Sequence, residues 1–302
     1  MKLATIDVGT NTALLLVAEA VGGEIEVLED QAEITRLGRG IGQDGGLGRE
    51  GIERTLAALR EYATLARRHQ APIAAIGTEA LRRAPNAQEF LGPAAAILGG
   101  PIEVIDGERE AALSFLAATR SFPAEAAGTM VVVDIGGGST EVIISRAGTV
   151  GFRRSLPLGS VRLTERHVRN DPALDGEVAA IVKDVGQALD SVAFPAGATL
   201  VGIAGTVTSL AAMAQRLRSY DPALVHGFRL TVAQLDSLVD DLRRSTQSER
   251  EKMPGLDPRR ADVILAGACI LREIARRSGA PHVVVSDRGI RWGLLYERLP
   301  IG

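Results

Sequence analysis

The sequence is poor in cysteine, lysine and aromatic residues, and it has no long hydrophobic run. Its one cysteine, Cys269, lies in an apolar stretch, which excludes disulfides and cysteine-based zinc sites and favours a reducing compartment. The longest apolar run, Val263 to Leu271, is about half of the roughly 18 residues that a membrane-spanning helix needs. No signal-peptide pattern follows Met1. We therefore expect a cytoplasmic protein that does not bind membranes.

The composition is that of an ordinary globular protein. The 302 residues are 46% hydrophobic and 24% charged, with a formal net charge of −3, and a chain of this length favours two domains. The near-neutral charge argues against general nucleic-acid binding. Most of the basic residues are arginine, whose planar guanidinium binds two phosphate oxygens at once. The four histidines have no metal-ligand spacing and are assigned no chemistry: they are His69, His167, His226 and His282.

The most informative feature is an internal repeat. The stretch Ile6–Thr12 runs into an apolar segment, and 127 residues later the stretch Val133–Thr140 does the same. Both are typical of a strand, an acidic turn and a second strand. Each is followed by a Leu-Gly pair, Leu37-Gly38 in the first copy and Leu158-Gly159 in the second. The repeat predicts two copies of one half-fold.

Helical and strand-like segments alternate along the rest of the chain. Apolar residues between 52 and 66 recur at helical spacing, whereas short β-like runs occur at 73–76, 102–105, 200–203 and 282–285. This alternation predicts an α/β fold. The periodicity breaks at 121–128, so we place the domain boundary near residue 124, with one domain at 1–124 and the other at 125–302. We expect a long helix from 259 to 277, following Pro258.

Two glycine turns are candidate phosphate sites. A strand that ends in Asp-x-Gly and turns back leaves backbone N–H groups in a concavity that can bind an anion. Two matched turns of this kind are stronger support for phosphate binding than one, because a single hairpin can use glycine for its backbone angles alone. The first turn comprises Gly9, Thr10, Asn11 and Thr12, and the second comprises Gly136, Gly137, Gly138, Ser139 and Thr140. The hydroxyls of Ser139 and Thr140 are candidate further donors.

A third candidate loop runs from 202 to 209 and contains Gly205 and Thr206. It leaves a strand and opens an apolar helix near Leu210, which is the geometry that points helix N-terminal amides at an anion. Alternatively, Thr206 or Thr208 is merely an N-cap. No Gly-Lys-[Ser/Thr] follows any of these loops, which excludes a P-loop NTPase, and the Rossmann fingerprint is also missing.

Carboxylates beside a phosphate site predict a divalent cation. At about 4 Å and an effective dielectric near 20, an aspartate and a phosphate oxygen repel each other by roughly 4 kcal/mol. Mg²⁺, or Mn²⁺, would remove this repulsion. Asp134 and Glu141, on the two arms of the second hairpin, are the candidate ligands, and Asp7 from the first repeat is a further one. The alternative for Glu141 is an exposed strand residue.

These segments together resemble the exopolyphosphatase/guanosine pentaphosphate phosphohydrolase family. The resemblance rests on Asp7–Thr12, Asp134–Glu141 and Gly205–Ser209, and it extends through 78–86, 259–264 and 286–289, hence through most of the chain. It implies two actin/hexokinase-like (ribonuclease H-like) lobes with the active site in the cleft between them. It also implies Mg²⁺-dependent hydrolysis of a phosphoanhydride, and it suggests a homodimer.

Two site residues come from the resemblance alone. The family's general base maps onto Glu110, with Glu108 as the alternative if the register shifts, and its phosphate-binding arginine maps onto Arg82. Arg82 is otherwise a surface helix arginine. Two features depart from the family pattern: Trp292 stands where the family usually has an acidic residue, and the chain stops at 302 without the further helical domains of long members.

We therefore expect a cytoplasmic exopolyphosphatase that releases terminal orthophosphate from short inorganic polyphosphates, with water as the nucleophile. The alternative substrate is a guanosine tetra- or pentaphosphate, with 5′-phosphohydrolysis of pppGpp as the reaction. A kinase of the same architecture would need nucleotide contacts in the second half, where the sequence shows only Gly267 inside a helix. A third alternative is a sensor that binds polyphosphate or alarmone without turnover.

Overall fold

The structure, a computed structural model, describes residues 1–41 and 45–299, which form two compact units. Unit 1 comprises Met1–Ala117 together with the C-terminal segment from Ile290 onward, and unit 2 comprises Ala118–Gly289. The expected division at residue 124 gave the whole C-terminal segment to the second domain. The structure differs in this point, since the last helix packs on the sheet of unit 1.

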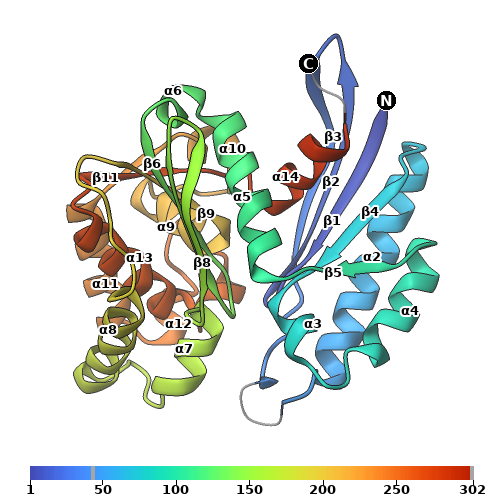
Figure 1. The fold of residues 1–302 in the computed structure, drawn as a ribbon. Helices are drawn as coiled ribbons and strands as arrows, with labels where there is room; N and C mark the ends of the chain where they lie inside the picture. The colour runs from blue at the N-terminus through green and yellow to red at the C-terminus, as the bar shows by residue number, and fades with distance from the viewer. Residues whose placement is uncertain (42–44, 300–302) are drawn as a thin grey trace. The chain divides into compact units, whose positions relative to one another are not determined.

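Unit 1 contains a five-stranded mixed sheet in the order β3-β2-β1-β4-β5. The first three strands form an antiparallel meander, and β4 and β5 continue parallel to β1. Figure 1 shows this sheet in blue and cyan. The strands are β1 (Lys2–Val8), β2 (Thr12–Val21), β3 (Glu24–Ile34), β4 (Ile73–Gly77) and β5 (Ile102–Val104).

Alternation along β1 sends side chains to two different helical layers. Ile6 and Val8 pack with α2 residues such as Leu59, whereas Leu3 packs with Trp292 of the last helix. The amphipathic helix expected over 52–66 is confirmed as part of α2. The helices of this unit are α2 (Arg49–Arg68), α3 (Glu79–Arg83), α4 (Gln88–Leu98), most of α5 (Gly107–Ser121) and α14 (Ile290–Arg298).

Unit 2 repeats this sheet and adds one strand. Its order is β10-β11-β9-β6-β7-β8, in which β6, β7 and β8 form the antiparallel meander and β9 and β11 continue parallel to β6. The predicted repeat and the predicted α/β class are therefore confirmed. The strands are β6 (Thr129–Ile135), β7 (Thr140–Arg146), β8 (Thr149–Leu156), β9 (Thr199–Ile203), β10 (Arg229–Thr231) and β11 (His282–Val285).

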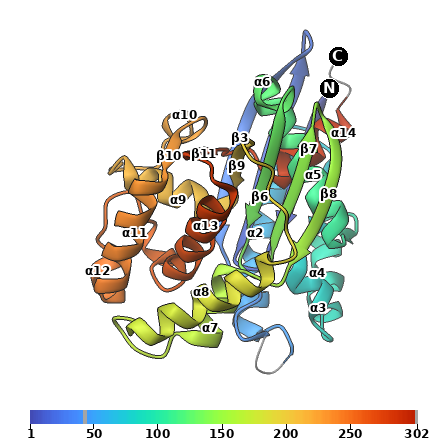
Figure 2. The same cartoon turned by 60° about the vertical axis from the view of Figure 1, so that its left-hand side comes forward.

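The largest apolar cluster of unit 2 is formed by its sheet and its helices together. Among these helices α13 packs against α7, α8, α9 and α11 (Figure 2). The long helix expected from 259 is shorter: a 3₁₀ turn over Pro258–Arg260 comes first, capped by the Asp257 side chain, and the α-helix starts at Ile264. Cys269 is buried in this helix, and burial raises the pKa of its thiol to about 11. The helices are α6 (Pro123–Ala126), α7 (Ser160–His167), α8 (Asp175–Leu189), α9 (Ala204–Ala214), α10 (Pro222–Val225), α11 (Val232–Arg244), α12 (Gln247–Arg250) and α13 (Ile264–Ser278).

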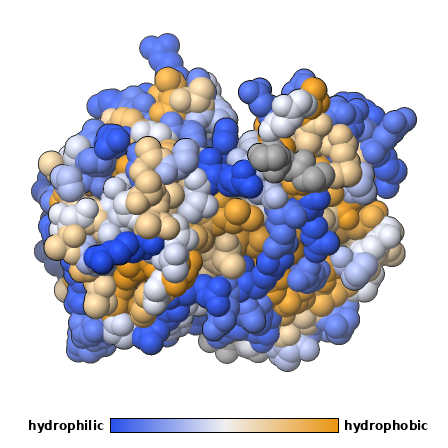
Figure 3. Space-filling view, turned by 45° about the horizontal axis from the view of Figure 1, so that its top comes forward, coloured by the Kyte–Doolittle hydropathy of each residue, from blue (hydrophilic) through white to orange (hydrophobic). Residues whose placement is uncertain are grey.

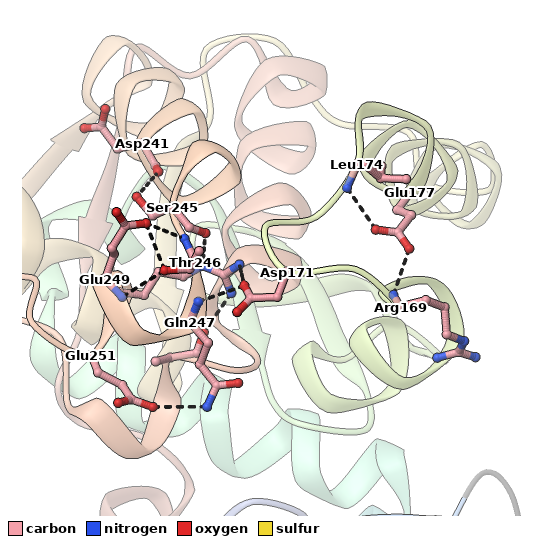
Figure 4. Close-up of polar contacts among 12 residues, drawn as sticks. Arg169, Asp171, Leu174, Glu177, Asp241, Ser245, Thr246, Gln247, Glu249 and Glu251 are labelled. Carbon is pink, nitrogen blue, oxygen red and sulfur yellow. Dashed lines mark hydrogen bonds and ion pairs between the residues drawn. The ribbon is translucent and has the colours of Figure 1, made fainter.

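Side-chain hydrogen bonds fix the segments that lead into α8 and α12 (Figure 4). Asp171 accepts a hydrogen bond from the backbone N–H of Gln247 at 2.8 Å, which ties the segment before α8 to the start of α12. Thr246 and Glu249 form a reciprocal capping box at that start. These contacts satisfy N-terminal amides that would otherwise lack partners.

The surface drawn in Figure 3 intersperses hydrophilic residues with smaller hydrophobic areas. Among the residues that the structure describes, no helix is both long enough and apolar enough to cross a bilayer.

Candidate active site

The two glycine turns have the same backbone hydrogen bond. In the first turn the N–H of Gly9 donates to the carbonyl of Thr12 at 3.0 Å, and in the second the N–H of Gly136 donates to the carbonyl of Ser139 at 3.0 Å. This match makes Asp7 and Asp134 equivalent positions, two residues before each glycine. The repeat seen in the sequence is thus a repeat of turn geometry.

In unit 2, the start of α7 holds the carbonyls of the three glycines of the second turn. The carbonyls of Gly136 and Gly137 accept from the N–H groups of Ser160 and Val161 at 3.0 and 2.9 Å, and that of Gly138 accepts from Arg162 Nε at 2.6 Å. In a trans peptide the N–H points opposite to the preceding carbonyl. The N–H groups of residues 137–139 therefore point away from α7 as one row, which is an arrangement that binds anions.

The glycines of the two Leu-Gly pairs allow a close approach to the turns. A Cβ on Gly159 would overlap the carbonyl of Gly137, and a Cβ on Gly38 would overlap the methyl group of Thr10. Both positions therefore require glycine, because the neighbouring segment presses directly on the turn. This contact explains why the Leu-Gly pair is repeated along with the turn.

The first turn is held by the segment that follows β3. The carbonyl of Asn11 accepts from the N–H groups of Thr35 and Arg36 at 3.0 Å each, and that of Thr10 accepts from Gly38 at 2.8 Å. Arg36 adopts a left-handed φ of 53° there. Asn11 is only 7% exposed, and within residues 1–41 and 45–299 its Nδ2 has no hydrogen-bond partner. A buried amide donor beside the turn is what an anionic ligand would use.

The two candidate metal ligands of unit 2 face each other across adjacent strands. Asp134 of β6 lies directly opposite Glu141 of β7, so their side chains share one face of the sheet. Asp134 is 4% exposed and Glu141 is 1% exposed, which excludes an exposed strand residue at 141. Ser155 donates a hydrogen bond to Glu141 at 2.6 Å. In unit 1 the residue opposite Asp7 is Leu14, so the carboxylate pair exists in unit 2 alone.

This pair fits a magnesium ion. Mg²⁺ takes oxygen ligands and is usually held by one or two carboxylates, with water completing its octahedron. Among the described residues, no group of three or more His, Cys, Asp and Glu side chains is arranged to hold a metal. A site on Asp134 and Glu141 would thus depend on water or phosphate for its other ligands.

Thr140 has a structural contact that the sequence did not indicate. Its hydroxyl donates to the carbonyl of Leu158 at 2.7 Å, and its side chain is fully buried. The hydroxyl proton expected to serve a phosphate is therefore directed at the Leu-Gly segment. Ser139 is 5% exposed.

The third loop forms the first turn of a helix. The helix α9 starts at Ala204, six residues before the expected start near Leu210, so Gly205 and Thr206 are helical. The N-cap is Ile203, and the alternative in which Thr206 or Thr208 is the N-cap is wrong. Ala204 has a φ of 74°, which is left-handed and followed by right-handed helix. Such a pair of conformations gathers successive N–H groups into an anion-binding nest.

Two residues to which the sequence analysis gives no role, Arg260 and Gly267, lie against this loop. A Cβ on Gly205 would overlap the guanidinium of Arg260, so this arginine lies against the loop. Burial lowers the pKa of Arg260, although the charge of Asp257 acts in the opposite sense. A Cβ on Gly267 would meet Thr206 Oγ1 at 3.0 Å, so the isolated glycine inside α13 permits helix packing. Close approach of two distant segments could not be read from either residue alone.

In unit 1, Arg82 and Glu110 are brought together. Arg82 Nη1 donates to the carbonyl of Ile105 at 2.6 Å and lies 3.4 Å from Glu110 Oε2. Arg82 is carried by the short helix α3, and Glu110 lies in the first turn of α5 with its side chain 8% exposed. Glu108, the alternative base, is exposed.

The fold and these sites define an α/β protein with two related units, each carrying a glycine turn suited to phosphate and a buried aspartate beside it. Residues 16–301 match the Ppx/GppA phosphatase family, and the chain belongs to this family. It is therefore a phosphatase, and the predicted resemblance and enzyme class are confirmed.

Similar proteins cover nearly the whole chain. The chain is 36% identical over 311 residues to exopolyphosphatase 2 of Mycobacterium tuberculosis, with 97% of each chain covered. A solved structure of the Aquifex aeolicus PPX-GPPA enzyme is 36% identical, covers 99% of each chain and has a TM-score of 0.84. An exopolyphosphatase from Cytophaga hutchinsonii is 26% identical, covers 100% of each chain and has a TM-score of 0.90.

Proposed function

We propose that this protein is a Mg²⁺-dependent exopolyphosphatase that releases terminal orthophosphate from short inorganic polyphosphates. The observation that carries the proposal is that unit 2 combines two loops whose backbone geometry suits an anion with the buried pair Asp134 and Glu141. The names of the similar proteins from M. tuberculosis and C. hutchinsonii agree with it. The reducing compartment that suits a single buried cysteine is the cytoplasm.

In this mechanism the chain binds phosphate through backbone N–H groups and moves one proton. The amides of residues 9–12, 136–139 and 205–206 bind the phosphates of the substrate. Glu110 accepts the proton of the attacking water, and Arg82, already 3.4 Å from that carboxylate, offsets charge on the terminal phosphate. Because water is the nucleophile, no covalent enzyme intermediate forms.

Asp134 and Glu141 would hold the Mg²⁺, with water or phosphate oxygens as its other ligands. The bound cation supplies neutralisation of the charge that develops on the leaving phosphate. Ser155, which donates to Glu141 at 2.6 Å, orients one of the two carboxylates.

The first test replaces the proposed base. Glu110→Gln keeps the shape of the side chain but cannot accept a proton, so we expect kcat for phosphate release to fall by about 10²–10⁴. Glu108→Gln is the matched control, since this residue lies in the same helical turn but is exposed, and it should keep wild-type activity. Free phosphate is measured with Mg²⁺ on polyphosphates of several lengths. Full activity in Glu110→Gln together with loss in Glu108→Gln would assign the base to Glu108.

The same assay separates the alternative functions. With pppGpp present in competition, preferred hydrolysis of the nucleotide would favour the pppGpp 5′-phosphohydrolase. Tight binding of polyphosphate or pppGpp without any phosphate release would favour the non-catalytic sensor. The homodimer implied by the resemblance stays a prediction, which light scattering of the purified protein tests.

A further inference from the structure

Glu79 is a buried carboxylate that the proposed mechanism does not use. It is the first residue of α3 and is 5% exposed. The strand β4 delivers it to the first glycine turn, because β4 lies parallel to β1 and the N–H of Thr78 donates to the carbonyl of Val8 at 3.2 Å. A carboxylate at this depth needs partners, since an isolated buried charge is costly.

Glu79 has a partner on each side. The hydroxyl of Thr10 donates to Glu79 Oε2 at 3.3 Å, and Arg83 Nη1 donates to Glu79 Oε1 at 3.1 Å. Glu79 and Arg83 are four residues apart on α3, which is the spacing that brings side chains together on a helix. Arg83 thereby offsets the negative charge of Glu79 beside the first glycine turn, to which the proposed function assigns phosphate binding.

The contact with Glu79 completes a clamp on Thr10. The methyl group of this threonine packs directly against Gly38, and its carbonyl accepts from the Gly38 N–H at 2.8 Å. With the hydroxyl directed at Glu79, the side chain of Thr10 is fixed on both sides. Arg82 on the same helix makes its own contacts with the carbonyl of Ile105 and with Glu110.

We propose that Glu79 is a positioning residue for phosphate binding, acting through the hydroxyl of Thr10 to fix the first glycine turn. This inference rests on the proposed function, because it assigns that turn to phosphate. The turn binds phosphate in the ground state and in the transition state alike. Loosening the turn therefore weakens substrate binding, which raises KM and leaves kcat unchanged.

The test compares variants in steady-state phosphate release from short polyphosphate with Mg²⁺. Glu79→Ala should raise KM about five- to tenfold with kcat within about twofold of wild type, as expected for loss of one buried hydrogen bond. Glu79→Gln keeps an oxygen acceptor for Thr10 and should restore KM to within about twofold of wild type. Should Glu79→Ala fail to fold, Glu79→Asp, which shortens the reach by one methylene, should raise KM in its place.

A double-mutant cycle tests the route through Thr10. Thr10→Val removes the hydroxyl, and Glu79→Ala added to it should raise KM no further. An unchanged KM in Glu79→Ala, a lower kcat at wild-type KM, or additive effects in the cycle would each overturn the proposal. The wild type and Glu110→Gln are measured alongside. If the wild type releases no phosphate, the proposed function fails. If the wild type is active and Glu79→Ala has the same KM and kcat, this inference alone is refuted.

Discussion

Burial changes the chemistry of individual side chains, and His226 shows this clearly. Its ring stacks on Phe122 with centroids 5.0 Å apart and planes 18° apart, and its Nδ1 accepts from the N–H of Asp287 at 3.3 Å. Burial, with a smaller contribution from Arg288, lowers the pKa of His226 from 6.5 to about 4. The folded protein therefore keeps this imidazole neutral, as an acceptor at Nδ1, throughout the physiological range.

The shift predicts an acid-sensitive contribution to stability. Between pH 6.5 and about 4 the unfolded chain binds a proton at His226 that the folded protein does not. The free energy of unfolding should therefore fall as the pH falls through this window, and the contribution of His226 to stability should be fully present above pH 6.5. Denaturant unfolding at several pH values measures the slope. The control His226→Asn keeps an acceptor but does not titrate, so its slope should be smaller; an equal slope in both proteins would contradict the assignment.

At the scale of elements, the structure explains why short sequence signals recur. The glycine of each Leu-Gly pair packs directly against one of the two glycine turns, Gly38 against Thr10 and Gly159 against Gly137. Close packing also explains two other glycines: Gly205 lies against the guanidinium of Arg260, and Gly267 lies against the side chain of Thr206. The helix α9 begins at Ala204, earlier than expected, and Ala204 takes a left-handed φ of 74° that its residue type does not indicate.

This packing predicts a strong effect of one methyl group at Gly159. In Gly159→Ala the new Cβ would overlap the carbonyl of Gly137, which must move and take the amide row of the second turn with it. We expect a loss of about 1–3 kcal/mol of stability, as for other overpacked sites, and a marked fall in kcat/KM for polyphosphate.

The matched control is Gly151→Ala on the preceding strand β8, where a Cβ meets nothing within 4 Å. It should leave kcat/KM and the unfolding midpoint near wild type. Equal kinetics in Gly159→Ala and Gly151→Ala would show that the turn tolerates displacement and is not a phosphate site.

At the scale of the whole molecule, the chain returns to its first unit at the end. A Cβ on Gly293 of α14 would overlap the carbonyl of Leu113 in α5, so the two helices cross at close range. Arg109 of α5 also donates to both carboxylate oxygens of Glu297 in α14 through its two terminal nitrogens, Nη1 and Nη2. The helix that carries Glu110 is thus supported by the last helix of the chain. Trp292, whose role the sequence left open, is 5% exposed and packs in the apolar cluster with Leu3 and Leu16.

The crossing predicts that Gly293→Ala destabilises unit 1. The chain contains one reporter per unit: its single tryptophan, Trp292, lies in unit 1, and its single cysteine, Cys269, lies buried in unit 2. In increasing denaturant, the Trp292 fluorescence transition of Gly293→Ala should shift to lower concentration than in wild type and should precede the exposure of the Cys269 thiol to a thiol reagent.

Gly92→Ala in α4 is the control in the same unit, because its Cβ meets nothing within 4 Å and alanine is the better helix former. It should leave the tryptophan transition unchanged or move it slightly higher. A Trp292 transition in Gly293→Ala that matches wild type would show that the helix crossing is not tight.

Much of this fold could be predicted because its signals are local. The repeated Asp-x-Gly turns, the period of α2 and the alternation of strands with helices each depend on residues close in sequence, and each was found. Glu79 cannot be singled out from the sequence, because a carboxylate in a short helix resembles a solvated residue; its burial and its contacts with Thr10 and Arg83 distinguish it. Arg260 cannot be singled out either, because only tertiary packing brings its guanidinium against Gly205.

The sequence by itself determined the α/β class, the two related units, the two glycine turns and the family, because backbone angles and side-chain periodicity are properties of neighbouring residues. The tertiary structure decided which groups meet: that Asp134 faces Glu141 below the surface, that Arg82 reaches Glu110, and that the last helix supports the first unit. Register, burial and close backbone contact arise only when distant segments pack together, so no local pattern specifies them.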